Sequence, residues 1–302
     1  MRPISRLKKL ILLTFLLTLI MGGVPGLVSA QQQPPPQAPP PSYPPEELDQ
    51  LVSRVALYPD PLLAQILAAA TYPDQVPDAA KYADEHHYLR GDDLARAIAQ
   101  DHLPWDPSVQ ALIPFPSVLE MMASDMNWTS ELGNAFLAQQ QDVMDAVQRM
   151  RKKARDYGYL RSNGQVVVAS GPYVTIMPVN PAFVCVPVYN PVVVFAPPRP
   201  GFFIGGAIGF GFGVNLGFAF APWGWGSTHF FWDRHEVFVA GSHWGRTWSN
   251  RGYYAHPYHG VQRWNGPRAP EHHELIRRSE SERRAPHEGH ARPEEHHDHG
   301  RR

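Results

Sequence analysis

The chain has 302 residues, a formal net charge of -1 and a single cysteine, Cys185. Its length could hold two domains, but long stretches lack a globular composition, and a lone cysteine excludes an intramolecular disulfide. The charge is uneven, because residues 31–158 carry a net charge of -9 and residues 159–302 a net charge of +4.

The N-terminus has the pattern of a secretory signal peptide. Four basic residues precede an apolar run from Leu10 to Met21, and Val28-Ser29-Ala30 offers small residues before a cleavage point. A retained membrane anchor is the alternative, although about twelve apolar residues are few for a bilayer span. We therefore expect residues 1–30 to be removed on export.

Residues 31–45 consist almost entirely of proline and glutamine, which predicts an extended linker. Helical periodicity begins at Glu46. Two similar units follow, LYPDPLLAQIL from Leu57 and LPWDPSVQALI from Leu103, and each contains an Asp-Pro pair before apolar residues at helical spacing. An aspartate accepts hydrogen bonds from free N–H groups at a helix start, and proline fits the next position. We therefore predict structural helix caps at Asp60, Pro61, Asp106 and Pro107.

The longest predicted helix begins near Thr129 or Ser130 and ends before Gly158. Apolar residues three and four apart give it one buried stripe, and basic residues crowd its last turns. We interpret those cations, Arg151 among them, as charge placed favourably at the negative end of the helix dipole.

These helical motifs carry a resemblance to a known family. The stretches ALYPDPLLAQILAAATYP, WDPSVQAL, FPSVLEMM and NWTSELGNAFLAQQQDVMDAVQRMR, followed by VPVYNP, resemble the secreted bacterial family catalogued as domain of unknown function number thirty-three hundred. The resemblance covers about Glu46 to Val194. It implies a location in the periplasm or cell envelope of a Gram-negative bacterium, and it supplies no catalytic residues.

Short β-branched runs follow between residues 165 and 195, divided by Gly-Pro and Asn-Pro pairs. We predict strands at 165–169, 173–179, 183–188 and 192–195. The fold class is therefore α+β, with a bundle of about six helices followed by a small antiparallel sheet packed on it. Residues 46–195 would form this helical domain.

The segment 196–227 is rich in glycine and aromatic residues and allows three structures. Its small residues recur every four positions, as in membrane helices that approach closely; these are Gly205, Gly209, Gly213 and Gly217. The phenylalanines from Phe210 to Phe220 alternate with small or polar residues, as in a strand, and a disordered linker is the third alternative. The helical alternative predicts association with a membrane or with copies of the chain through 202–223.

Residues 228–268 mix aromatic residues, histidine and arginine, with one predicted strand at Glu236 to Ala240. Aromatic rings at this density could stack on an envelope glycan or settle at a membrane interface. Export argues against nucleic acid as a partner. Residues 269–302 are charged, rich in histidine and almost free of apolar residues, which predicts a disordered tail.

No motif of a known catalytic site is present, and no His/Cys spacing predicts a structured metal site. We expect no cofactor and no metal, apart from loose capture of metal by the tail as an alternative. Cys185 falls in a predicted strand and is interpreted as a small buried residue. The sequence favours a non-enzymatic envelope protein. The alternatives are a glycan-binding or peptidoglycan-binding module, with candidate residues Trp223, Trp225, Trp232, Trp244 and Trp248, and a hydrolase with an unrecognised site.

Overall fold

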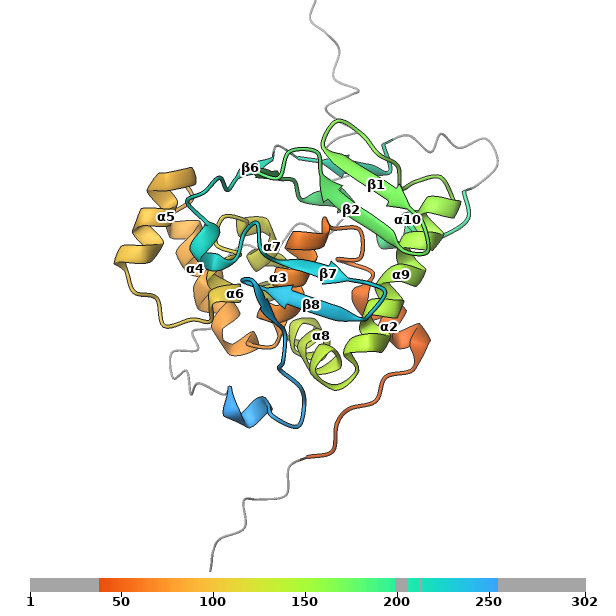
Figure 1. The fold of residues 1–302 in the computed structure, drawn as a ribbon, viewed down its shortest axis with the longest axis horizontal. Helices are drawn as coiled ribbons and strands as arrows, with labels where there is room; N and C mark the ends of the chain where they lie inside the picture. The colour runs from red at the N-terminus through yellow and green to blue at the C-terminus, as the bar shows by residue number, and fades with distance from the viewer. Residues whose placement is uncertain (1–37, 199–205, 212, 255–302) are drawn as a thin grey trace, which may run out of the picture. The chain divides into compact units, whose positions relative to one another are not determined.

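The computed structural model describes residues 38–198, 206–211 and 213–254 (Figure 1). The chain divides after residue 39, and every element described below belongs to the part that begins at residue 40. The predicted signal peptide, the predicted tail from 269 and most of the linker lie outside the described residues. Among the described residues, no helix combines the length and the apolar character that a bilayer crossing requires.

The described part has the predicted α+β class, with helices first and small antiparallel sheets after them. The helices are α2 (Pro45–Val52), α3 (Asp60–Ala70), α4 (Val76–Glu85), α5 (Gly91–Gln100), α6 (Pro107–Gln110), α7 (Pro116–Ser124), α8 (Met126–Ala138), α9 (Gln140–Asp156) and α10 (Pro191–Val194). The 3-10 turns are η1 (Pro73–Gln75), η2 (Ala221–Trp223) and η3 (Arg251–Tyr253).

Helix α3 lies at the centre of the described part, between other helices and the strands of the second half (Figure 1). All of its residues except Pro61 are buried, because its sequence DPLLAQILAAA is apolar around nearly the whole circumference. Its one polar side chain beyond Asp60 is Gln65, whose Nε2 donates to the Trp223 carbonyl oxygen at 3.0 Å and to Thr228 Oγ1 at 3.1 Å. The central helix is therefore bonded directly to residues more than 150 positions later.

The predicted long helix is two helices. Helix α8 ends at Ala138 and α9 begins at Gln140, with Gln139 between them at φ -139° and ψ 50°. The Gln139 side chain accepts from the Tyr43 backbone N–H at 2.7 Å, and its Nε2 donates to Asp142 at 2.9 Å. The break thus coincides with an anchor for the segment that leads into α2. Gly158 follows α9 at φ +81°, as expected for a glycine after a helix end.

The strands form small separate sheets. They are β1 (Val166–Ser170), β2 (Val174–Pro178), β3 (Phe183–Val184), β4 (Pro187–Tyr189), β5 (Ile208–Phe210), β6 (Val214–Asn215), β7 (His229–Phe231), β8 (Glu236–Val239) and β9 (Ser242–His243). The antiparallel pairs are β1–β2, β3–β6 and β4–β5, and β7–β8–β9 form a three-stranded sheet. The strand predicted at 236–240 corresponds to β8.

The run predicted as a strand at 192–195 is instead the short helix α10. Asn190 caps it, since its Oδ1 accepts from the Val192 N–H at 3.0 Å, and Pro191 occupies the first helical position. Asn-Pro here is the same helix-start signal as the two Asp-Pro pairs. The β-branched composition of the run misdirected the prediction.

The core extends beyond the predicted helical domain. Residues of 216–237 share one apolar cluster with the helices; these are Leu216, Phe220, Trp223, Trp225, Phe230, Trp232 and Val237. The predicted domain boundary at residue 195 therefore does not match the structure, because the described parts of 196–227 and 228–254 pack on the same core.

Candidate functional site

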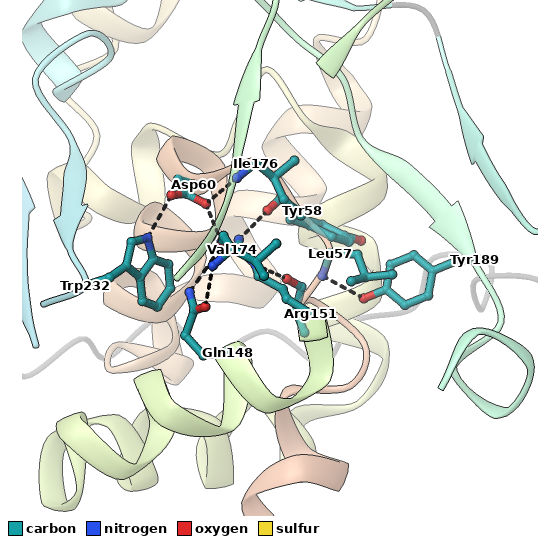
Figure 2. A network of polar contacts seen from close by, with 10 residues as sticks. Leu57, Tyr58, Asp60, Gln148, Arg151, Val174, Ile176, Tyr189 and Trp232 are labelled. Carbon is teal, nitrogen blue, oxygen red and sulfur yellow. Dashed lines mark hydrogen bonds and ion pairs between the residues drawn. The ribbon is translucent and has the colours of Figure 1, made fainter. Parts of the chain in front are cut away.

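The most concentrated group of buried polar side chains surrounds an ion pair between Asp60 and Arg151 (Figure 2). Arg151 Nη1 donates to Asp60 Oδ1 at 2.6 Å, and the two side chains are 0% and 5% exposed. Removing two charges from water is costly, and it is tolerated only where further hydrogen bonds compensate. The surroundings of both residues supply those bonds.

Most of the hydrogen-bond donors of the Arg151 guanidinium group bond to backbone carbonyl oxygens. Its Nε donates to Ala56 at 2.8 Å, Nη2 to Tyr58 at 2.9 Å and Nη1 to Val174 at 3.0 Å. The first two carbonyls belong to the turn that leads into α3. One guanidinium group of α9 therefore fixes the entry of the central helix and also holds strand β2.

Asp60 receives three donors. Besides Arg151, its Oδ1 accepts from the Ile176 backbone N–H at 3.2 Å, and its Oδ2 accepts from Trp232 Nε1 at 2.9 Å. The Trp232 ring also contacts the Arg151 guanidinium, 5.0 Å from its centroid, which adds a cation–π contact to the pair. The carboxylate thus joins α3 to β2 and to the chain directly after β7.

Side chains of this cluster hydrogen-bond the backbone groups along the edge of β2 that has no neighbouring strand. Gln148 Oε1 accepts from the Val174 N–H at 2.8 Å, and Gln148 Nε2 donates to the Val174 carbonyl oxygen at 3.1 Å. A buried strand edge needs a partner for each N–H and C=O group. Gln148, Arg151 and Asp60 serve here in place of a neighbouring strand, as Figure 2 shows.

Two tyrosines line the entry turn of α3. Tyr189 Oη donates to the Ser53 carbonyl oxygen at 2.8 Å and accepts from the Leu57 N–H at 3.4 Å. The Tyr58 ring meets it edge on, with centroids 6.5 Å apart. Burial raises the pKa of both phenols above 10.0, so both stay protonated at neutral pH. Neither hydroxyl is available as a base.

The group as a whole has the properties of a structural junction. Each carboxylate oxygen of Asp60 already accepts at least one bond. Strand β2 and the turn before α3 contribute backbone groups to the cluster. A reactive centre would need a nucleophile or base with free access to a substrate. In the part of the chain that the structure describes, no group of three or more His, Cys, Asp or Glu side chains could hold a metal ion.

The predicted helix caps have different positions in the structure. Asp106 is the N-cap of α6, with its Oδ1 accepting from the Ser108 N–H at 2.9 Å, and Pro107 is the first helical residue. Asp60 is already inside α3, where the N-cap is Pro59, and its side chain makes no capping bond. The capping prediction is wrong for Asp60, because the buried guanidinium and indole donors compete for its carboxylate.

The predicted association glycines do not lie on a helix in the described residues. Gly205 lies outside them, whereas Gly209 is in β5, Gly213 precedes β6 and Gly217 has φ +49°. A Cβ added at Gly213 would come within 3.2 Å of Cys185 Sγ. The helical alternative for this segment is therefore incorrect in the described range, and the strand alternative fits it better.

The candidate glycan-binding tryptophans are mostly in the core. Trp223, Trp225 and Trp232 are buried, and Trp244 and Trp248 are half-buried. Trp225 Nε1 donates to the Ala111 carbonyl oxygen at 3.1 Å. The three buried rings, Trp223, Trp225 and Trp232, belong to the core and have no free face for a sugar. Cys185 is buried as predicted, and burial raises the pKa of its thiol.

Sequence reasoning missed Arg151 and Trp232 as members of one cluster. One signal was available, since Arg151 follows Val147 by four residues and precedes Ala154 by three, on the apolar stripe of α9. An arginine on that stripe has to be buried with partners. No local pattern indicates Trp232, which is 172 positions from Asp60.

Comparison with known proteins assigns the chain to a family. Residues 44–290 match the family described as "Protein of unknown function (DUF3300)", and the chain belongs to it, as the helical motifs predict. The chain is also similar to the uncharacterized protein YacH of Escherichia coli (strain K12), with 36% identity over 182 residues. That match covers 49% of this chain and 29% of YacH, so the chain spans less than a third of that relative. The search of solved structures found no significant match.

Proposed function

We propose that the protein is an exported, non-enzymatic component of the cell envelope that associates with a membrane or with copies of itself. The observation that supports the proposal is that the two buried charges, Asp60 and Arg151, bond to groups of the chain itself. Asp60 and Arg151 are hydrogen-bonded on every side to backbone and to Trp232. The ion pair therefore contributes cohesion between segments, and function is left to the surface.

Export is supported by the N-terminal sequence. The order of basic residues, an apolar run at 10–21 and small residues at 28–30 is that of a signal peptide. The family resemblance implies the same location. Exported proteins that lack disulfides depend on packing for stability, and the continuous core from Leu48 to Val237 supplies it.

Cell fractionation tests the proposal. The full chain, expressed in a Gram-negative host, should be recovered from the envelope or periplasm with an intact mass that begins at Gln31. A variant with Leu12→Arg and Leu16→Arg, which interrupts the apolar run, should remain in the cytoplasm and retain Met1. The matched control replaces both leucines by isoleucine and should be exported. Recovery of the unaltered chain from the cytoplasm with Met1 in place would contradict the proposal.

A further inference from the structure

Exposed apolar side chains are concentrated in one part of the described chain. Of the ten large hydrophobic residues that are exposed, seven lie between residues 167 and 193. The apolar face is defined here by six of them, which are Val167, Met177, Phe183, Val188, Val192 and Val193. Exposed apolar patches are uncommon on proteins that act alone in water, and they mark interaction sites. Val167 and Met177 are direct cross-strand neighbours, and Val192 and Val193 are consecutive residues of α10.

The fold explains why these side chains point outward. Val167 and Met177 are cross-strand partners in the β1–β2 hairpin, so they project from the same side of it. Their neighbours Val166 and Ile176 alternate to the buried side. On α10, Val194 is fully buried whereas Val192 is 81% exposed. The hairpin and α10 therefore each carry apolar residues on their exposed side in addition to those that they bury in the core.

The apolar face lies in a region without acidic residues. Between residues 157 and 232 the sequence contains no Asp, Glu or Lys, and its only charged residues are Arg161 and Arg199. Such a stretch contrasts with the helices before it, where acidic residues outnumber basic ones. The segment that carries the exposed valines therefore contributes no negative charge of its own.

A cationic rim borders this face. Lys152 continues the stripe of α9 that carries Gln148 and Arg151, since residues three and four apart share a helix face. Arg155 lies on the same stripe and is paired with Asp156 at 2.8 Å. Gln148 and Arg151 both bond the backbone of Val174 in β2, so the basic end of α9 lies beside the hairpin. None of the ion pairs in the described residues includes Lys152 or Arg161.

Both edges of the hairpin are occupied. Ser162 Oγ accepts from the Val168 N–H at 2.9 Å, and Asn163 Oδ1 accepts from the Val166 N–H at 3.0 Å, which closes the outer edge of β1. The edge of β2 is closed by the buried side chains described above. A partner therefore cannot add a strand here and has to contact the face.

We propose that the apolar face docks on a lipid surface with anionic headgroups, as a peripheral contact and not as a span. Valine and phenylalanine side chains would enter the interface between headgroups and acyl chains, and Lys152 and Arg161 would meet the headgroups. A second copy fits less well, because it would bring two cationic rims together. This inference rests on the proposed function, because export places the face beside lipid.

Vesicle binding tests the docking surface. Residues 31–302 are used, because the apolar run at 10–21 would itself partition into lipid, and residues 40–302 form a compact unit of their own. The protein should sediment with vesicles of phosphatidylcholine and phosphatidylglycerol, and more weakly with phosphatidylcholine alone. Val192→Ser with Val193→Ser should lower the partition coefficient about tenfold. Lys152→Gln with Arg161→Gln should remove most of the preference for phosphatidylglycerol.

The matched control is Tyr88→Ser. Tyr88 is 70% exposed, but it follows α4 in an acidic part of the surface, and its replacement should leave vesicle binding unchanged. The proposal is overturned if the valine variant and the control bind alike. It is also overturned if sedimentation velocity without lipid shows a dimer that the valine variant dissociates, since the face would then cover a second copy. Neither outcome bears on export, which fractionation tests separately.

Discussion

Replacing Asp60 by asparagine should destabilise the protein far more than the same change at Asp106. Asparagine keeps one acceptor oxygen and gains an NH2 group. At Asp60, one carboxylate oxygen faces Arg151 and Ile176 and the other faces the Trp232 N–H, so the new NH2 meets a donor in either orientation. The Arg151 charge is also left without its partner.

The expected loss follows from the burial of the pair. Breaking a fully buried ion pair costs about 3–5 kcal/mol, which is a large share of the 5–15 kcal/mol that stabilises a typical domain. At Asp106 the side chain accepts from the Ser108 N–H at a helix start. Asparagine performs that task equally well, so Asp106→Asn should be nearly neutral, whereas Asp106→Ala should cost about 0.5–2 kcal/mol.

Urea unfolding followed by circular dichroism measures these differences, and a double-mutant cycle isolates the pair. Asp60→Asn combined with Arg151→Met should be less destabilising than the sum of the two single changes, because the double variant leaves no buried charge. The double variant should remain less stable than the unaltered chain, since the Ala56 and Tyr58 carbonyl oxygens lose their Arg151 donors at about 1–3 kcal/mol each. A cost below 1 kcal/mol for Asp60→Asn, or strict additivity in the cycle, would refute the reasoning.

Three further outcomes are expected. Residues 46–195 alone should unfold at lower urea than residues 40–254, because each buried aromatic residue lost after 216 removes about 1.5–3 kcal/mol; equal midpoints would contradict this. Gly133→Ala should cost about 1–3 kcal/mol or more in the same assay, since the new Cβ would lie 1.9 Å from a carbonyl oxygen of α3, whereas Gly164→Ala meets nothing within 4 Å. Burial is the main cause that raises the pKa of Tyr72 from 10.0 to about 12, and the negative charge of Asp106 is the second cause. Its contribution to stability should therefore be intact below pH 10 and be lost between pH 10 and about 12, and Tyr72→Phe should remove this part of the pH dependence.

Local helix signals predicted much of the first half correctly. Helices α6 and α7 begin at the prolines of WDPSVQAL and FPSVLEMM, and α3 begins at the first Asp-Pro pair. These signals act within one turn of backbone, which is why a single sequence reveals them. The same rule holds at Pro191, where Asn190 caps α10, but the prediction followed the β-branched run 192–195 and was wrong.

Long-range partners account for what the sequence did not reveal. Residues 134–157 contain no glycine or proline, and the helix break at Gln139 coincides with a bond to Tyr43, 96 positions away. Arg151 is likewise placed by carbonyl groups more than 90 positions earlier. A prediction from local propensity does not account for such long-range contacts, which determine the structure at these positions.

In the glycine-rich segment, the free-energy cost of glycine in a helix decides between the helix pattern and the strand pattern. Each glycine in a water-exposed helix costs about 1 kcal/mol relative to alanine, so four at regular spacing weigh against a helix. Strands β5 and β6 instead pair with β4 and β3, whose paired residues precede them by 19 to 32 positions. Their backbone groups on those edges are already bonded within the chain. Strand addition at those edges would have to break these pairs, whereas association through the apolar face breaks none. The side chains of Val167, Met177 and Val192, and not the glycines, are therefore the residues whose replacement should change binding to lipid.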